Sequence, residues 1–372
     1  MSDLSSAESL HYQRHLALSQ FGISSQKKLK SSSILVVGAG GLGCPALQYL
    51  AAAGVGKIGI IDGDKVEASN LQRQVLFTYD DIGKYKAETA RNKISLLNPY
   101  VEIKHFNERL TPENIEERLR AYSVILDGSD NFETKYLLND ASILFNKVLI
   151  YGSIFEFSAQ ISVFNLNNGP TYRCLFPEPP SGDALPPCTE AGVLGVLPGI
   201  AGSIQASEAI KVMTGLGEPL SGKLLLFDAL TLKTQVVTFN LRPDSRNIKN
   251  LPTFTPTCSA LRDEGESISE IDTLDMKKMN ESGKTDIIID VREQWERDEL
   301  KISPSIHIPL GYFEHPEQIE FPVSITHDSH IVLYCKAGVR SRMACHALQA
   351  LGYRNLYNLS GGIMEWSDYP NT

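Results

Sequence analysis

Cys335 and Arg340 stand close together in a pattern that suits sulfur chemistry. Four residues separate them, in a loop between an apolar strand pattern and a helical one. Such a loop points backbone N–H groups inward and stabilises negative charge on a cysteine sulfur, and Lys336 and Arg340 add positive potential. Cysteine phosphatases need a longer loop to hold a phosphate, so the spacing predicts a persulfide site with Cys335 and Arg340 as catalytic residues. A buried structural cysteine at a strand end is the alternative.

A glycine-rich turn predicts a second site, one that binds a nucleotide. The turn follows the apolar strand pattern 34–37 and opens a helical stretch, and its glycines are Gly38, Gly40, Gly41 and Gly43. Glycines let a backbone approach phosphates closely, and a helix N-terminus favours their negative charge. Asp62 ends the next strand pattern, where it can accept hydrogen bonds from ribose hydroxyls. NAD is the usual ligand of such a turn, and a turn that only permits tight packing is the alternative without a ligand.

Charged and amide side chains that follow the glycine turn favour ATP over NAD. Asn70 and Arg73 lie in one segment with Ser69 and Leu71, and Lys86, Asp130 and Asn131 follow further along the chain. Hydride transfer needs no such set, whereas adenylation of a carboxylate must hold a triphosphate and neutralise pyrophosphate as it leaves. A carboxylate such as Asp130 can hold the Mg²⁺ that bridges those phosphates. Taken singly, each of these residues could equally be an ordinary surface or capping side chain.

Cys188 is a further candidate catalytic residue. It lies on a loop rich in glycine, proline and aspartate, shortly before a helical stretch that starts near residue 193. A thiol near a helix N-terminus ionises more readily, which makes it a better nucleophile. The alternative is a small buried residue that packs the loop.

The elements that position these residues fall into two α/β units. Strand and helix patterns alternate from residue 34 to 146, which predicts a Rossmann-like, mostly parallel sheet with helices on both faces. Successive strand patterns between 148 and 241 predict an added antiparallel portion. Residues 242–267 lack hydrophobic periodicity and are rich in Pro, Asn, Ser and Thr, so they predict a linker. The predicted domains are therefore 1–241 and a smaller α/β domain at 268–372.

Composition narrows the expected partners and location. The net charge is -9, so nucleic acid and anionic membrane are not expected partners, because both attract locally basic surfaces. No apolar run is long enough to span a membrane, and residues 1–10 lack the order of a signal peptide, which predicts a cytoplasmic enzyme. The six cysteines are scattered without a C-x-x-C pair, so neither a disulfide framework nor the commonest zinc signature is expected.

The motifs of the first unit together resemble the MoeB/ThiF family of ubiquitin-activating-like adenylyltransferases. The resemblance covers residues 8–241 and rests on the segments 12–15, 38–43, 69–74 and 188–195, together with Asp62 and Lys86. It implies that ATP and Mg²⁺ are bound by Gly41, Asp62, Asn70, Arg73, Lys86 and Asp130. It also implies that Arg14 reaches the phosphates of a neighbouring subunit, and hence a homodimer. Cys188 would take part in thioester or acyl-persulfide chemistry.

Two cysteine pairs that bind structural zinc in that family are incomplete here. At the first pair the chain reads Thr171 to Cys174, with one cysteine replaced, and at the second it reads Arg242 to Ser245, without a cysteine. Cys258 is a single thiol further along the chain. One or two thiols cannot build a four-coordinate zinc site, so we expect no zinc, with packing in its place.

The second unit resembles the rhodanese family over residues 268–372. Segments 289–293 and 358–363 look like the opening and closing motifs of that family, on either side of the Cys335 loop. The fusion implies that one half adenylates the C-terminal Gly-Gly of a small ubiquitin-like sulfur-carrier protein, and that the other supplies sulfur to make a thiocarboxylate. This is the reaction of molybdopterin-synthase sulfurylases, and the product could serve molybdopterin, thiamine or tRNA thiolation. A cysteine desulfurase could load Cys335.

Three other functions stay open from the sequence. A redox enzyme could use NAD at the glycine turn, but that leaves Arg73, Lys86 and Cys335 unexplained. A tRNA-modifying relative would need a basic surface, which the acidic composition disfavours. The rhodanese unit could also be a docking module without activity, although the presence of Cys335 and Arg340 argues against that.

Overall fold

The structure is a computed structural model, which describes residues 3–179, 192–251, 268–314, 316, 319, 321 and 325–368. The chain divides into two compact units, and among these residues the first ends at 251 and the second begins at 268. The start of the predicted linker, Pro243–Arg246, forms the short 3-10 helix η4 within the first unit. Cys188 and Cys258 lie outside the described residues.

An eight-stranded sheet forms the centre of the first unit, in the order β3-β2-β1-β4-β5-β6-β7-β8. Five strands are parallel: β1 (Ser33–Val37), β2 (Lys57–Ile61), β3 (Glu102–Phe106), β4 (Val124–Asp127) and β5 (Val148–Phe155). The antiparallel strands are β6 (Ser158–Phe164), β7 (Lys223–Asp228) and β8 (Thr234–Thr238). The mostly parallel sheet with an added antiparallel portion is therefore confirmed. All five residues of the edge strand β8 are exposed.

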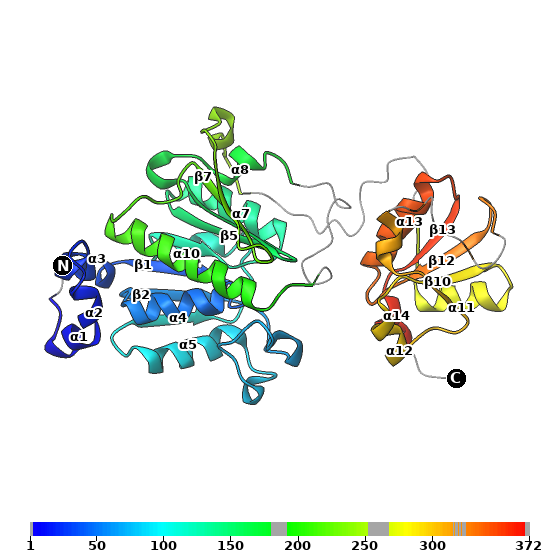
Figure 1. Ribbon diagram of the computed structural model, residues 1–372, viewed down its shortest axis with the longest axis horizontal. Coiled ribbons are helices and arrows are strands. Elements are labelled where there is room, and N and C mark those ends of the chain that lie inside the picture. The colour runs from blue at the N-terminus through cyan, green and yellow to red at the C-terminus, as the bar shows by residue number, and fades with distance from the viewer. Residues whose placement is uncertain are drawn as a thin grey trace. The chain divides into compact units, whose positions relative to one another are not determined.

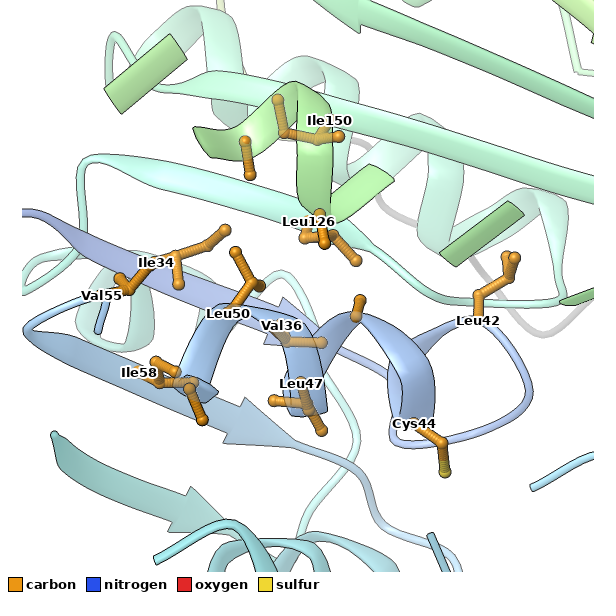
Figure 2. Close-up of a cluster of buried hydrophobic side chains, with 14 of the residues drawn as sticks. Ile34, Val36, Leu42, Cys44, Leu47, Leu50, Val55, Ile58, Leu126 and Ile150 are labelled. Carbon is orange, nitrogen blue, oxygen red and sulfur yellow. The ribbon is translucent and has the colours of Figure 1, made fainter. Parts of the chain in front are cut away.

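Helices cover both faces of this sheet (Figure 1). One face carries α4 (Gly43–Ala53), α5 (Lys86–Leu97) and α10 (Val196–Thr214), and the other carries α6 (Ile115–Leu119) and α7 (Phe132–Leu144). Three short helices precede the sheet, namely α1 (Ser6–His11), α2 (Gln13–Leu16) and α3 (Gly22–Lys30). Figure 2 shows Leu47 and Leu50 of α4 packed over Ile34, Val36 and Ile58 of the parallel strands. Full burial of one such side chain contributes about 1.5–3 kcal/mol, so this face anchors the helix that follows the glycine turn.

The second unit is a smaller α/β domain, as predicted, with five parallel strands. Their order is β11 (Ile306–His307), β10 (Ile287–Asp290), β12 (His330–Tyr334), β13 (Asn355–Leu359) and β9 (Ser269–Ile271). One apolar cluster lies under α13 (Val339–Ala350) and the 3-10 helix η5 (Leu310–Glu314). A second cluster on the opposite face lies under α11 (Thr273–Glu281) and α14 (Gly362–Asp368). Among the described residues of both units, no helix combines the length and apolar character needed to cross a membrane.

Candidate active sites

The glycine turn lies where the strand order of the first sheet reverses. β1 has β2 on one side and β4 on the other, so the connections after β1 and β4 leave in opposite directions and open a crevice at the carboxyl ends of the strands. A Cβ on Gly43 would overlap the carbonyl oxygen of Gly38, so only glycine fits there. A Cβ on Gly38 would lie 2.7 Å from the carbonyl oxygen of Gly128. The turn is thus in contact with the loop that carries Asp130.

Asp62 directly follows β2 and contacts the glycine turn at this crevice. Its Oδ2 accepts a hydrogen bond from the Ala39 N–H in the glycine turn at 2.8 Å, and its Oδ1 accepts one from the Asp64 N–H at 2.8 Å. Burial raises the pKa of Asp62, and these hydrogen bonds and the nearby Lys86 only partly offset it. A carboxylate with a raised pKa is one whose charge the protein alone does not fully stabilise.

Lys86 is the first residue of α5 and is buried. Its Nζ lies 3.3 Å from Oδ2 of Asp64, a residue whose own side chain is 53% exposed and which also pairs with Arg109. The contact of this buried lysine is therefore a long one, to a carboxylate that is itself half-exposed. The structure places Lys86 at the start of a helix, as the sequence predicts, and beside Asp64 of the segment that leaves Asp62.

Arg73 lies against the glycine turn at Gly41. A Cβ on Gly41 would lie 3.8 Å from Cγ of Arg73, and the guanidinium donates to the Ser69 carbonyl at 3.1 Å. Asn70 is buried, and its Oδ1 accepts the N–H of Glu67 at 3.1 Å. Leu71 packs against the core of the first unit. The structure brings Arg73 to the turn, while the side chains of Asn70 and Leu71 hold the segment in place.

Asp130 is exposed at the mouth of the crevice, two residues beyond Gly128. The neighbouring Asn131 caps α7, since its Oδ1 accepts the N–H of Thr134 at 2.9 Å. Asp130 therefore presents its carboxylate to solvent, whereas the acceptor oxygen of Asn131 is engaged within the protein.

A buried ion pair beneath Asp130 was missed in the sequence. Lys135 and Asp127 are both buried, with Nζ and Oδ2 2.9 Å apart. Lys135 Nζ also donates to the carbonyl oxygens of Ser129 at 3.1 Å and Gly152 at 2.9 Å, and Asp127 Oδ1 accepts the Ser129 N–H at 2.9 Å. The pair therefore fixes the backbone next to Asp130. A lysine within the apolar stretch of α7 was the signal that could have revealed it.

Arg14 is not brought to the glycine turn of its own chain. It is exposed on α2, next to Tyr12, whose hydroxyl accepts a hydrogen bond from Asn98 at 2.9 Å. Tyr12 packs on Gly54, which caps the C-terminal end of α4. The glycine turn lies at the other end of α4. Because the eleven residues of α4 span about 16 Å, Arg14 is far from the turn of its own chain.

The positions of the incomplete zinc pairs meet around one sulfur. Cys174 Sγ lies 3.1 Å from Ser245 Oγ and accepts the N–H groups of Thr171 at 3.3 Å and Arg242 at 3.4 Å. Burial opposes ionisation of this thiol, but the hydrogen bonds outweigh it and lower the pKa of Cys174. Across the described ranges, no group of three or more His, Cys, Asp or Glu side chains could hold a metal ion.

The Cys335 loop joins β12 to α13 in the second unit. The Cys335 side chain is buried, and its Sγ accepts the Gly338 N–H at 3.1 Å and the Ser341 hydroxyl at 3.4 Å. Gly338 has φ +93°, a left-handed conformation that glycine adopts without strain. The closing motif packs on the loop, because the Cys335 carbonyl accepts the Ile363 N–H at 2.9 Å. The loop thus directs donors at the sulfur, as predicted.

The opening motif supports the loop from β10. Asp290 is buried and bonds to Arg292 Nη2 at 2.8 Å, Arg297 Nη1 at 3.2 Å and the Tyr334 hydroxyl at 2.8 Å. Burial alone would raise the pKa of Asp290, but the hydrogen bonds from Arg292 and Tyr334 hold it below its usual value. Because Tyr334 directly precedes Cys335, this network fixes the start of the loop.

Arg340 is paired with a carboxylate that the sequence reasoning missed. Its Nη1 and Nη2 donate to Glu296 Oε2 and Oε1 at 2.7 and 2.8 Å. Glu296 lies on α12 (Gln294–Glu299), three residues beyond the opening motif. Burial opposes ionisation of Glu296, but the hydrogen bond from Arg340 outweighs it and lowers the pKa of this carboxyl group. Cys345, by contrast, is buried in the core, and burial raises its pKa.

Both halves of the chain match known families. The ThiF family matches residues 12–249, and a rhodanese-like domain matches residues 272–369. The first match spans more than half of the chain. The chain belongs to the ThiF family. In this ThiF-family protein the rhodanese-like domain follows the ThiF domain along the chain, as the motifs predict.

Similar proteins carry the same combination. This ThiF-family chain is 40% identical over 373 residues to the probable adenylyltransferase/sulfurtransferase MoeZ of Mycobacterium tuberculosis, covering 98% of this chain and 94% of that protein. It is 37% identical over 393 residues to the adenylyltransferase and sulfurtransferase MOCS3 of Sus scrofa, covering 98% and 86%. The sulfur carrier protein adenylyltransferase of Thermus thermophilus is 50% identical over 237 residues, or 62% of this chain and 88% of that protein. The predicted adenylyltransferase and sulfurtransferase enzyme is confirmed, and the NAD-dependent alternative is set aside.

The fold recurs among solved structures. The crystal structure of E. coli MccB with ATP superposes with a TM-score of 0.56 and 23% identity, covering 64% of this chain and 73% of that chain. At this identity the likeness shows a shared fold. It agrees with the parallel sheet and antiparallel extension described above.

Proposed function

We propose that the first unit adenylates the C-terminal carboxylate of a small ubiquitin-like sulfur-carrier protein, and that the second unit delivers sulfur to it from Cys335. One observation carries the proposal: a glycine-turn crevice with Arg73 and Lys86 close by and a cysteine loop that directs donors at its sulfur occur on one chain. In the first step the carboxylate attacks the α-phosphorus of ATP and pyrophosphate leaves. In the second a persulfide on Cys335 attacks the acyl carbon, AMP leaves, and an acyl-persulfide remains on Cys335. Attack of a second thiolate, for which we propose Cys188, on the Cys335 sulfur then breaks the S–S bond, forms a Cys188–Cys335 disulfide and releases the thiocarboxylate.

We propose specific tasks for the residues of the crevice. Asp62 accepts the ribose hydroxyls, while Arg73 and Lys86 approach the triphosphate from opposite sides of the glycine turn. Asp130 is exposed and supported by the Lys135–Asp127 pair, which suits a carboxylate that holds Mg²⁺. The ion would neutralise charge on the phosphates when bound. The remaining predicted contacts are those of Gly38, Gly40, Gly41, Gly43, Ser69, Asn70, Leu71 and Asn131.

An apolar surface beside the crevice supports a protein substrate. We define the edge patch as Phe155, Phe157, Leu194, Leu230 and Leu232, whose exposed fractions run from 41 to 71%. Its segments are joined by backbone bonds from Ala229 N–H to the Phe157 carbonyl at 2.8 Å and from Leu194 N–H to the Glu156 carbonyl at 3.3 Å. β5 is parallel to β4, and β7 runs in the same direction because β6 is antiparallel to both β5 and β7. The patch therefore lies at the same end of the sheet as the crevice. Exposed apolar groups of this kind mark interaction sites.

The edge patch is connected to the nucleotide residues. A Cβ on Gly195, next to Leu194, would overlap the Gln72 carbonyl, and Gln72 directly precedes Arg73. A carrier whose tail enters the crevice would rest its folded body on this patch. The double variant L230S/L232S should raise the KM for carrier about tenfold or more through lost apolar burial, and leave the KM for ATP unchanged. L96S, at an 87% exposed leucine on α5, is the matched control.

The proposed homodimer rests on the position of Arg14. Because this exposed residue lies at the far end of α4 from its own glycine turn, only a second copy could place it at a nucleotide. Chains with R14A and chains with D130A should each be inactive alone. Co-expressed, they should regain activity, since one site of the mixed dimer then has both side chains. Failure of the mixture to recover, with mixed dimers verified by mass, would place Arg14 outside the site.

ATP–pyrophosphate exchange tests the activation step. We expect exchange only when a carrier that ends in Gly-Gly is added, because the carboxylate is the attacking group. A carrier without its last glycine is the control. Exchange that does not depend on carrier would overturn the proposal.

We further propose a cytoplasmic location, a cysteine desulfurase as the source of the sulfur, and a contribution of Cys188 to the transfer. The four described cysteines are all free thiols, in keeping with a reducing compartment. Incubation of the full chain with a desulfurase and cysteine should add one sulfur atom to Cys335, detectable by mass spectrometry. Absence of that adduct would point to another donor.

A further inference from the structure

A buried carboxylate faces the sulfur-transfer loop from a different element. Both oxygens of Glu296 accept hydrogen bonds from Arg340, and Oε2 also accepts the Glu293 N–H at 3.0 Å. The exposed fractions of the Arg340 and Glu296 side chains are 13% and 10%. A two-pronged pair of this kind, removed from water, is strong and directional.

We propose that Glu296 is a positioning residue that sets which sulfur donors Cys335 accepts. It holds the Arg340 guanidinium in one orientation and cancels its charge, so the loop attracts multiply charged anionic donors only weakly. The proposal rests on sulfur transfer at Cys335 and adds a specificity determinant to it.

The contacts of the loop show that the sulfur is stabilised by neutral donors, while Glu296 neutralises Arg340. Cys335 Sγ is stabilised by the Gly338 N–H and the Ser341 hydroxyl, whose partial charges suffice for a singly charged thiolate or persulfide. Lys336 is exposed, so solvent and salt screen its charge. Arg340 is the loop cation that is largely removed from water, and Glu296 neutralises it there.

Thiosulfate shows why this neutralisation matters. The Cys335 thiolate attacks the outer sulfur of thiosulfate, the S–S bond breaks, sulfite leaves with the electron pair, and a persulfide remains on Cys335. Charge is conserved, but a dianion must approach a thiolate. An Arg340 guanidinium without its carboxylate partner would attract the thiosulfate dianion and ease this approach. The same guanidinium would attract a donor with a single negative charge less strongly.

The test compares the full-length E296Q variant with the wild type, using thiosulfate and glutathione persulfide as donors. We expect the KM for thiosulfate to fall about tenfold in E296Q as Arg340 regains its effective charge, with a smaller change for glutathione persulfide. The pH profile with thiosulfate should move to lower pH, because a nearby cation favours the thiolate. E299Q, at an exposed glutamate of the same helix, removes the same charge from the surface. It should leave the KM for thiosulfate and the pH profile unchanged.

Other outcomes overturn the proposal. If Glu296 only stabilised the fold, E296Q would lower kcat with both donors alike and leave the pH profile in place. An equal fall in KM in E299Q would assign the effect to net charge.

A measurement on the wild type does not depend on the folding of a variant. Alkylation of Cys335 by iodoacetate and by neutral iodoacetamide, followed by mass spectrometry, reports the field at the sulfur directly. We expect a rate ratio close to that of a free cysteine, and a strong preference for iodoacetate would overturn the neutralisation by Glu296. If the wild type transferred no sulfur from any donor, the proposed function of the second unit would fail, while this ratio would still decide the role of Glu296.

Discussion

The nucleotide crevice and the Cys335 loop both stabilise anions, but they treat charged side chains in opposite ways. In the crevice, burial raises the pKa of Asp62, Arg73 donates to a backbone carbonyl, and Asp130 is exposed. Around the Cys335 loop, Asp290 is paired with the buried Arg292 and Glu296 with the mostly buried Arg340, and the pKa of each carboxyl group is lowered.

Under the proposed function, this difference follows from the charge that each site would accept. The triphosphate of the proposed reaction brings several negative charges. In the crevice Asp130 is exposed, Lys86 has only a long contact to the half-exposed Asp64, and Arg73 donates to a backbone carbonyl, so each could exchange its present contact for the ligand. A persulfide brings one charge, which backbone N–H groups can stabilise, so the charged side chains of the second unit are free to stabilise the fold. Substitution of the charged residues of the crevice should therefore lower activity. Substitution of the charged residues around the Cys335 loop should lower both activity and the free energy of unfolding.

Cys335→Ala should have the largest effect and should separate the two sites. The variant removes the atom that carries sulfur, so thiocarboxylate formation should fall to background with any donor. ATP–pyrophosphate exchange should stay near the wild-type rate, because Cys335 belongs to the other unit. Mass spectrometry of the carrier provides the measurement, and thiocarboxylate formed at the normal rate would show that the rhodanese-like domain is not the donor.

Asp130→Ala and Arg73→Ala should each reduce exchange by about 100- to 1,000-fold, since each removes charge stabilisation at the leaving pyrophosphate. Neither should change the melting temperature, because both side chains are free of buried ion pairs in the structure described here. Glu133→Ala, at an exposed acid in the first turn of α7, is the matched control. Full exchange activity in Asp130→Ala would contradict the assignment.

Lys135→Met should destabilise the first unit by about 3 kcal/mol, because it leaves the buried Asp127 carboxylate without its partner. Exchange should fall as well, through the loss of the hydrogen bond that holds Ser129. Chemical denaturation followed by fluorescence measures the first effect. Lys147→Met, a variant at a lysine outside α7, serves as the control, and equal stabilities of the two variants would remove the support assigned to Lys135.

The smallest effect should be a difference in pH dependence. Asp62 has a raised pKa, so its contribution to stability is greatest at acid pH and is lost as the pH rises through its folded-state pKa. Relative to Asp62→Asn, the nucleotide-free wild type should therefore gain stability as the pH falls from about 7 through the folded-state pKa.

Asp290 should behave in the opposite sense. Its pKa is lowered, so its contribution is present at neutral pH and is lost as the pH falls through the folded-state value. Asp290→Asn should destabilise the second unit at about pH 7 and matter less near pH 3. Thermal unfolding between about pH 3 and pH 7 tests both variants. If the melting temperatures of the two variants, relative to the wild type, changed with pH in the same direction, the contrast between the two sites would be lost.

The sequence predicted the elements and the two loops because their signals are local. The glycine turn, the strand pattern before it and Asp62 lie within thirty residues, and the Cys335 loop is a single segment. The missed residues depend on tertiary contacts. Glu296 meets Arg340 across 44 residues of sequence, and Lys135 contacts Gly152 on a neighbouring strand. No pattern in the sequence pairs a buried charge with its partner, since many acids and bases lie at similar spacings.

The edge strand β8 has a consequence for the colloidal behaviour of the protein. In the part of the chain that is described, β8 is paired with β7 alone, and its residues 234–238 carry no charge and no proline. Val236 and Val237 are 49% and 39% exposed. A flat, uncharged edge of this kind templates pairing with other chains, and many proteins block it with an inward-facing lysine. Concentrated protein should therefore form strand-paired aggregates slowly, and V236K should suppress their light scattering while leaving ATP–pyrophosphate exchange intact.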